Sequence, residues 1–151
     1  MPDVLLITGA GGMIGTELVN YLGQGGRLVV ALVTHDPSRY PQFENVKYVK
    51  CDIFNSDEIC RVMEKYKPTG LIHLAWRSTG QFESNENFEF VSASVNLVKL
   101  FIRFGGRRLV FAGTYAEYAS SEDKLVEAES EIRPLTVYAK CKNWTSQILA
   151  C

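Results

Sequence analysis

Several features are scarce in this 151-residue sequence, and each scarcity excludes a class of protein. There are only two histidines, and the four cysteines form no Cys-x-x-Cys pair, so the ligand spacing typical of a zinc site is missing. No metal site is therefore predicted. The expected state of the cysteines is four reduced thiols in a cytosolic protein, at Cys51, Cys60, Cys141 and Cys151.

An excess of one charge and long apolar runs are also missing. The 16 Lys and Arg residues nearly balance the 17 Asp and Glu residues, which argues against non-specific nucleic-acid binding through a basic surface. No apolar run approaches the roughly 20 residues that span a bilayer, and Met1-Pro2-Asp3 lacks the basic start of a signal peptide. We expect a cytoplasmic protein with no nucleic-acid or membrane partner.

What the sequence does have is an alternation of short apolar runs and longer amphipathic segments. Strands are predicted over residues 4–8, 28–34, 46–49, 70–75 and 108–112. Helices are predicted over 13–22, 56–66, 83–104 and 137–150, with Ser56 as an N-cap followed by Asp57 and Glu58. Apolar strands separated by helices are typical of a parallel sheet covered on both faces. The predicted fold class is α/β, a doubly wound parallel sheet of at least five strands.

The densest glycine cluster, TGAGGMIG, lies between the first predicted strand and the first predicted helix. In that context a glycine-rich pattern predicts a dinucleotide site. We expect Gly9 to allow the tight turn, Gly12 to let backbone amides approach a pyrophosphate, and Gly15 to let helix and strand pack closely. Met13 and Ile14 begin the helix, whose N-terminal amides favour an anion. The alternative is a glycine-rich turn that binds nothing.

The choice of nucleotide depends on the end of the second predicted strand. NAD-binding proteins usually place a carboxylate there for the ribose hydroxyls, but this sequence has Val33 and Thr34, with Asp36 slightly late and Arg39 close by. Thr34 and Arg39 are the predicted residues around the ribose. A missing carboxylate beside a cation favours NADP over NAD, and an exposed loop without this role is the alternative.

The spacing Thr-Gly-x-x-Gly-x-x-Gly resembles that of the extended short-chain dehydrogenase/reductase superfamily. Further stretches resemble the same superfamily in the same order: CDI (51–53), HLA (73–75), FAGTYAEY (111–118) and YAKCK (138–142). The last three together most resemble nucleotide-sugar 4-reductases and 4-epimerases. The resemblance implies a Rossmann-type domain that binds NAD or NADP and acts on a nucleotide sugar. It also places Asp52 and Ile53 at the adenine, and Leu74 and Ala75 beside the cofactor.

Three further residues are implied to be catalytic. Tyr138 is the proton-transfer residue, although a free tyrosine is a poor base. Lys142 lies one helical turn later on the same side of the helix, where its charge stabilises the phenolate. By resemblance, Lys142 also holds the nicotinamide ribose, so Tyr138 and Lys142 belong to the cofactor site as well. Thr114 is expected to hydrogen-bond the sugar oxygen.

Four residues near these motifs are open to two interpretations. His73 either lines the cofactor pocket or is a hydrogen-bonded core residue, and Trp76 either borders the substrate or packs beneath the long helix. Glu117 and Glu127 lie where such enzymes bring the substrate close, with surface charge as the simpler interpretation.

The resemblance covers only the front half of such an enzyme, so the C-terminal substrate lobe is absent from residues 1–151. These residues are interpreted as one NAD(P)-binding domain that is truncated after the YxxxK helix. The chain is then a fragment of an enzyme, a subunit completed by a partner chain, or a short non-catalytic binding protein. We favour the first because all the catalytic residues are retained. The fifth strand would be an exposed edge, and helices 83–104 and 137–150 resemble those of a homodimer four-helix bundle.

Overall fold

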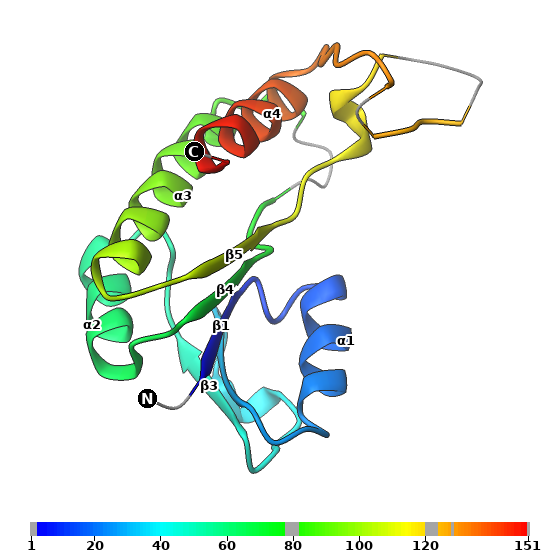
Figure 1. Cartoon of the computed structure of the whole chain (residues 1–151). Coiled ribbons are helices and arrows are strands. Elements are labelled where there is room, and N and C mark those ends of the chain that lie inside the picture. Colours follow the sequence, from blue (N-terminus) through cyan, green and yellow to red (C-terminus); the bar gives the residue numbers. More distant parts are fainter. Residues whose placement is uncertain (1–2, 78–81, 120–123, 128, 151) are drawn as a thin grey trace. The chain divides into compact units, whose positions relative to one another are not determined.

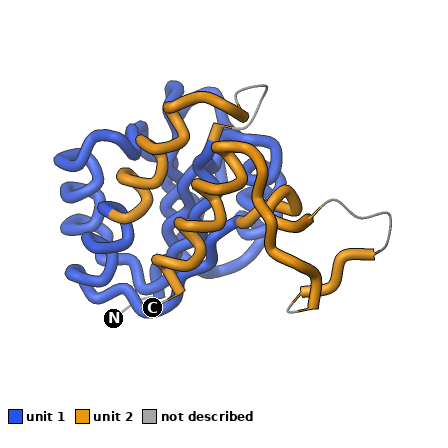
Figure 2. The backbone as a smooth tube through the Cα atoms, turned by 90° about the horizontal axis from the view of Figure 1, so that it is seen from above, with its two compact units in different colours: residues 1–76, 96–112 blue, residues 77–95, 113–151 orange. Residues whose placement is uncertain are grey.

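The computed structural model describes residues 3–77, 82–119, 124–127 and 129–150. The chain divides into two compact units, which Figure 2 shows in different colours. Unit 1 comprises residues 1–76 and 96–112, and unit 2 comprises residues 77–95 and 113–151.

Unit 1 contains a five-stranded sheet. Its strands are β1 (Val4–Thr8), β2 (Leu28–Val33), β3 (Val46–Lys50), β4 (Gly70–His73) and β5 (Arg108–Phe111). All neighbouring strands are parallel, in the order β3-β2-β1-β4-β5. The parallel sheet predicted from the sequence is therefore confirmed, although β2 ends one residue earlier than predicted and β4 ends two residues earlier.

Within the described residues, three helices and one short 3-10 turn connect the strands, and a second 3-10 turn and a fourth helix follow β5. The helices are α1 (Met13–Leu22), α2 (Ser56–Tyr66), α3 (Glu86–Arg103) and α4 (Val137–Leu149), and the turns are η1 (Pro37–Arg39) and η2 (Tyr115–Glu117). Within unit 1, α1 covers one face of the sheet, while α2 and the second half of α3 cover the other (Figure 1). This is the predicted doubly wound, Rossmann-type arrangement.

The core of unit 1 is built on the central strands. Every residue of β1 is buried, as are five of the six residues of β2, and Leu6 and Ile7 have no exposed surface. Because helices cover both faces of the sheet, both sets of alternating side chains are buried, so these strands are apolar throughout. The carboxyl end of β1 leads directly into the glycine-rich loop.

The N-cap of α2 is Asn55 rather than the predicted Ser56. The side-chain oxygen of Asn55 accepts hydrogen bonds from the backbone N–H groups of Asp57 (3.1 Å) and Glu58 (3.2 Å). Ser56 is the first helical residue, and its hydroxyl accepts a hydrogen bond from Asn96 instead. Asn and Ser are about equally good N-caps, so propensity did not distinguish two adjacent candidates.

Other sequence-based expectations can also be compared with the structure. Strand β5 is an edge of the sheet, as predicted, and Val110 on it is 52% exposed. Cys51, Cys60 and Cys141 are free thiols, whereas Cys151 lies outside the described residues. Within the described ranges, no three His, Cys, Asp or Glu side chains are grouped to hold a metal ion, and no helix has the length and apolar character to span a bilayer.

Candidate active site

The glycine-rich loop has little room for side chains. Gly9 adopts a φ of 68°, a conformation that favours glycine. A Cβ atom at Gly9 would lie 2.7 Å from the backbone nitrogen of Ala75. A Cβ atom at Gly15 would overlap the carbonyl oxygen of Gly9 and lie 2.7 Å from the Cα of Ala10. The loop thus requires glycine at both positions, which supports the roles predicted for them.

The start of α1 is open to an anion. Gly12 is the N-cap residue in an extended conformation, and within the described chain no side chain caps this first turn. Met13 and Ile14 follow and are 87% and 61% exposed. The first amides of a helix lack intrahelical acceptors and carry a partial positive charge. A close glycine turn with open helix amides therefore fits the diphosphate of a dinucleotide.

A cavity of about 280 Å³ lies at the carboxyl ends of β2 and β3 in unit 1, lined by Thr34, Lys50, Cys51, Asp52 and Glu58. The backbone N–H of Asp52 donates to the Glu58 carboxylate (2.9 Å), and the Asp52 carboxylate accepts from the N–H of Phe54 (3.0 Å). Thr34 and Asp52, predicted independently, thus line one cavity. Ile53 is buried and does not line this cavity.

Arg39 lies outside the lining of that cavity, exposed at the end of η1. This turn is capped by Asp36, whose carboxylate accepts a hydrogen bond from the N–H of Ser38 (2.9 Å). Hydrogen bonding from Ser38 is the main cause that lowers the pKa of Asp36, and the charges of Lys50 and Arg39 act in the same direction. The late carboxylate noted in the sequence is therefore a turn cap with two cations near it.

His73, Leu74 and Ala75 bind the end of β1. His73 is 1% exposed, and its Nδ1 lies 2.6 Å from the hydroxyl of Thr8. The N–H of Leu74 donates to the carbonyl of Thr8 (3.2 Å), and the N–H of Ala75 donates to its hydroxyl (3.2 Å). These bonds hold Leu74 and Ala75 close to the turn at Gly9, and their place beside the cofactor stays a prediction.

The rings of His73 and Trp76 both contact Phe111 at the end of β5. The ring centroids are 5.5 Å apart for His73 and 6.2 Å apart for Trp76, which approaches edge-on. His73 is thus a hydrogen-bonded core residue, as one of its two interpretations had it. Trp76 packs on Phe111 of β5, a contact that matches neither of its two predicted places, which both stay predictions.

Unit 2 contains all three predicted catalytic residues. Tyr138 and Lys142 lie one turn apart in α4, which begins where the Thr136 hydroxyl accepts a hydrogen bond from the N–H of Ala139 (3.1 Å). The N–H of Tyr138 donates to the carbonyl of Phe82 (2.8 Å), and the two rings pack edge-on with centroids 5.6 Å apart. The tyrosine backbone and ring are therefore held on two sides.

Thr114 begins η2 and is joined to α4 by a residue that the sequence interpretation undervalued. The Glu117 carboxylate accepts a hydrogen bond from the N–H of Thr114 (2.9 Å) and another from the side-chain amide of Asn143 (3.3 Å). Glu117 is half-buried, so its simpler interpretation as surface charge is wrong. The available sequence signal was the Thr-x-x-Glu spacing of a capping box, which the structure forms in η2.

Lys142 is a buried cation that is only 3% exposed. Burial lowers the pKa of Lys142 from 10.5 to about 8, and the Glu117 carboxylate partly opposes this by favouring the charged amine. A lysine whose pKa lies close to neutrality is typical of a functional site.

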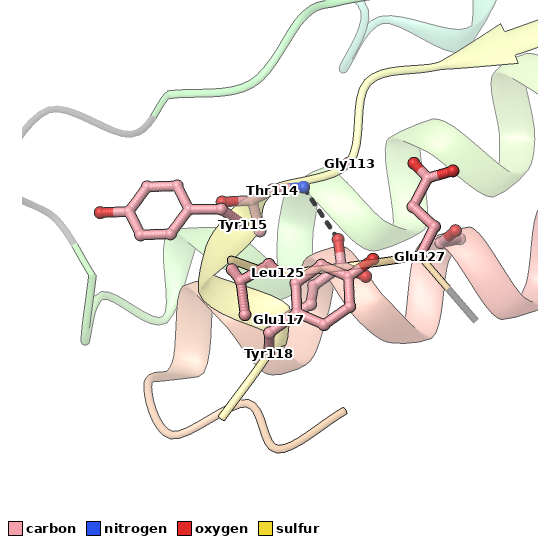
Figure 3. Close-up of a pocket in the computed structure, with 8 residues that line it drawn as sticks. Gly113, Thr114, Tyr115, Glu117, Tyr118, Leu125 and Glu127 are labelled. Atoms are coloured by element: carbon pink, nitrogen blue, oxygen red, sulfur yellow. Dashed lines mark hydrogen bonds between the residues drawn. The ribbon is translucent and has the colours of Figure 1, made fainter. Parts of the chain in front are cut away.

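A cavity of about 550 Å³ in unit 2 adjoins Thr114 and is lined by Gly113, Thr114, Tyr115, Glu117, Tyr118, Leu125, Glu127 and Ser146 (Figure 3). The Tyr115 ring points away from the other labelled side chains in Figure 3 and is 82% exposed. The remaining lining offers two carboxylates and several hydroxyls, which can accept hydrogen bonds from a hydroxyl-rich ligand. Glu127 therefore lines the same cavity as Thr114.

With this geometry in view, the chain can be compared with known proteins. Residues 5–150 match the profile of the NAD dependent epimerase/dehydratase family. This chain belongs to that family. The family agrees with the resemblance to extended short-chain dehydrogenases/reductases noted in the sequence.

Individual relatives of this epimerase/dehydratase chain are distant and longer. A UDP-glucuronate 4-epimerase from Thermodesulfobacterium geofontis is 28% identical over 91% of this chain, which matches 47% of that protein. Among solved structures, a UDP-glucose 4-epimerase from Thermus thermophilus in complex with NAD is 25% identical, with a TM-score of 0.85 over 97% of this chain and 50% of the other. The Bordetella bronchiseptica enzyme WbmG in complex with NAD, 20% identical with a TM-score of 0.82, shows the fold alone. The chain spans about half the length of these proteins.

The buried charge of Lys142 leads to a prediction about stability. Lys142→Met is expected to raise the free energy of unfolding at pH 7 by up to about 3 kcal/mol, because a pKa lowered from 10.5 to about 8 is a folding penalty of that size. The Glu117 carboxylate keeps its hydrogen bonds from Thr114 and Asn143 in this variant, so it is not left unpaired. Urea denaturation at pH 7 measures the gain.

The same prediction has a pH dependence with a definite sign. The folded protein loses the Lys142 proton near pH 8, whereas the unfolded chain keeps it until about pH 10.5. The penalty is therefore complete below pH 8 and fades as the pH rises, so wild type and Lys142→Met should converge above pH 10.5. Lys140→Met, exposed on the same helix, is the control and should change stability little. A Lys142→Met protein that is less stable than wild type at pH 7 would contradict the prediction.

Proposed function

We propose that this chain is the cofactor-binding half of an NAD(P)-dependent oxidoreductase that acts on a nucleotide-diphosphate sugar, of the 4-epimerase or 4-keto reductase type. The observation that carries the proposal is the placement of Tyr138 and Lys142 on successive turns of α4, with Thr114 connected to that helix through Glu117. The family supports it, as does a relative named as a UDP-glucuronate 4-epimerase.

In this proposal Tyr138 removes the proton from a sugar hydroxyl and returns it in the reverse direction. The Lys142 ammonium stabilises the phenolate that this role requires. The Thr114 hydroxyl accepts a hydrogen bond from the N–H of Ala116 (3.3 Å), which leaves its own O–H free to donate to the sugar oxygen. When bound, the nicotinamide supplies the hydride chemistry, and the protein orients and polarises the reacting groups.

The cofactor site is proposed on unit 1. The loop at Gly9, Gly12 and Gly15, with the amides of Met13 and Ile14, would hold the diphosphate. The adenosine would then extend toward the cavity at Thr34 and Asp52, beside Ile53, and the nicotinamide half toward Leu74 and Ala75. Tyr138 and Lys142 would contact the nicotinamide ribose, by analogy with the superfamily. Solved relatives are described with NAD bound.

We infer a preference for NADP from the charges near the proposed ribose site. The Asp36 carboxylate caps η1, and Arg39 and Lys50 act on it as cations. A 2′-phosphate would be favoured by these two cations, whereas a ribose hydroxyl pair would need a carboxylate free to accept hydrogen bonds.

Arg39→Ala tests this preference. It is expected to weaken NADPH binding about tenfold with little effect on NADH, because one charge-assisted hydrogen bond to phosphate is removed. Fluorescence titration with both reduced cofactors measures the effect, and Arg103→Ala in the last turn of α3 is the matched control. Equal losses for both cofactors, or none for NADPH, would count against an NADP preference.

The alternative function is a non-catalytic dinucleotide-binding subunit or fragment that needs a partner chain to complete the substrate site. The observations that favour it are the exposed edge at β5 and the half-length match to the relatives. Chromatography of the sugar product, with nicotinamide absorbance for a net reduction, distinguishes the two functions when UDP-sugars are added. Cofactor binding without an isomerised or reduced sugar would support the binding subunit, and turnover would support the enzyme.

We also propose that the chain forms a homodimer through α3 and α4. Both helices present large apolar side chains to solvent: Phe88 (45% exposed) and Ile102 (65%) on α3, and Trp144 (48%) and Ile148 (49%) on α4. Large apolar side chains exposed on a helix are a feature of association sites. Sedimentation analysis of the purified chain tests the oligomeric state.

A further inference from the structure

We propose that Glu117 is a positioning residue of the candidate active site. Its carboxylate holds the Thr114 turn to α4 and maintains the positive charge of Lys142. This inference rests on the proposed function, because it assigns Glu117 a part in the same site. Neither the family match nor the motifs in the sequence give Glu117 such a part.

The first argument is geometric. One carboxylate oxygen of Glu117 accepts the N–H of Thr114 (2.9 Å), and the other accepts the side-chain amide of Asn143 (3.3 Å). The main chain of Glu117 is fixed as well, because its N–H donates to the carbonyl of Thr114 (3.2 Å) and its carbonyl accepts from the N–H of Arg133 (2.8 Å). Both the main chain and the carboxylate of Glu117 are held in place. Because this carboxylate contacts Thr114 and Asn143 together, it determines where the Thr114 hydroxyl lies relative to α4.

The partner on α4 is itself ordered. Asn143 directly follows Lys142 and is 8% exposed. Its side-chain oxygen accepts a hydrogen bond from Gln147, which leaves its amide N–H₂ to donate to Glu117. Gly113 has no side chain to crowd the Glu117 carboxylate, since a Cβ atom at this position would lie 3.1 Å from it. Glu117 therefore bridges two ordered elements of unit 2.

The second argument concerns charge. Lys142 is buried, and burial disfavours its ammonium form, while the Glu117 carboxylate on η2 favours it.

The other groups to compare with Glu117 lie on α4 and in and before the first turn of α3. On α4, Tyr138 lies one turn before Lys142 and Asn143 lies beside it, whereas Lys140 is exposed. From the segment that precedes α3, the apolar ring of Phe82 packs on Tyr138, and Glu86 at the start of α3 pairs with Arg77. Among the described residues, Glu117 is thus a carboxylate whose charge acts on Lys142.

Glu117→Gln tests the charge, because it removes the negative charge and keeps the shape of the side chain, with one carbonyl oxygen left to accept one of the two hydrogen bonds from Thr114 and Asn143. The Lys142 ammonium should then lose its proton at a pH lower by about half a unit or more. The readout is the ¹³Cε chemical shift of Lys142 as a function of pH in ¹³C-lysine-labelled full chain without cofactor. Lys142→Met assigns the resonance.

Controls distinguish a charge effect from a structural one. Glu131→Gln removes an exposed carboxylate whose residue bonds to Ala119 only through its backbone carbonyl, so the Lys142 titration should not move. If Glu117→Gln does not fold, Glu117→Asp is measured, and the midpoint should move down by a smaller amount. An unchanged midpoint in the folded variants would overturn the proposal. Failure of both variants to fold would also overturn it, by showing a purely structural role.

An activity measurement separates this inference from the proposed function. If Lys142 titrates lower in Glu117→Gln, kcat/KM on a UDP-sugar should fall several-fold at alkaline pH, with the KM for the cofactor unchanged. A shifted Lys142 titration in a chain that never turns over a nucleotide sugar would support the Glu117 contact and count against the proposed function. Wild-type turnover with an unshifted titration would support the function and refute the role of Glu117.

Discussion

Tyr138→Phe is expected to lower turnover of a nucleotide sugar by about a thousandfold, while the chain still binds NAD(P) with at most the loss of one hydrogen bond to the ribose, about 0.5–1.5 kcal/mol. The change removes only the phenolic oxygen with its hydrogen. In the proposed mechanism the phenolate form of that oxygen accepts the proton of the sugar hydroxyl, and the phenol returns it. General acid–base catalysis by one side chain contributes about 10²–10⁴-fold, so its loss should dominate the kinetics. The measurement is chromatography of the sugar product on mixing enzyme, cofactor and UDP-sugar, with nicotinamide absorbance added for a net reduction, and cofactor affinity is determined separately by titration.

The structure makes this substitution interpretable. The backbone N–H of Tyr138 donates to the carbonyl of Phe82, and the tyrosine ring packs edge-on against the Phe82 ring; neither contact involves the hydroxyl. The variant should therefore fold with α4 in place. Tyr21→Phe, which removes a hydroxyl from a tyrosine 76% exposed on α1, is the control and should retain wild-type turnover. Turnover by Tyr138→Phe above about a tenth of wild type would rule out Tyr138 as the main proton-transfer residue.

The sheet was predictable because its signal is local. Each strand of the core is a short apolar run, and such runs alternate with helical spacing along the chain, so the sequence predicts a parallel α/β sheet. Strand ends were less predictable, since they depend on partners elsewhere in the fold. Leu74 and Ala75 continue the apolar run of β4, yet their amides bind Thr8 at the end of β1, and the strand ends at His73.

The candidate site was predictable only where one element carries the pattern. Tyr138 and Lys142 are four residues apart in one helix, so the sequence alone predicts that they lie on the same side of α4. Glu117 and Asn143 are 26 residues apart and meet only in the folded chain, so no spacing rule pairs them. Surface charge was the reasonable expectation for Glu117, because most glutamates are exposed and its capping partner, Thr114, had been assigned another role.

The conformation of the glycine-rich loop leads to the second large prediction. Gly15→Ala is expected to weaken cofactor binding about a hundredfold and to lower the free energy of unfolding by about 1–3 kcal/mol. Gly15 is buried in the first turn of α1, and an added Cβ would overlap the carbonyl oxygen of Gly9 and lie 2.7 Å from the Cα of Ala10. Both obstacles are backbone atoms, so no side chain can move aside to make room.

The size of the binding effect follows from what must move. Relief of the overlap would displace the turn at Gly9 from the start of α1, and the loop amides would no longer converge on the proposed diphosphate site. Loss of two charge-assisted hydrogen bonds, at about 1.5–3 kcal/mol each, corresponds to about a hundredfold or more in affinity. Calorimetric titration with NADPH and NADH measures this effect, and chemical denaturation measures the stability.

Gly26→Ala supplies the matched control, because a Cβ atom at Gly26 would meet nothing within 4 Å. It should bind cofactor like wild type and be equally stable or slightly more so, since alanine reduces the conformational freedom of the unfolded chain. If Gly15→Ala loses stability but binds cofactor normally, the loop is a packing feature and the diphosphate is bound elsewhere. If it loses binding far beyond its loss of stability, the glycine at position 15 is required because the backbone must approach the ligand closely.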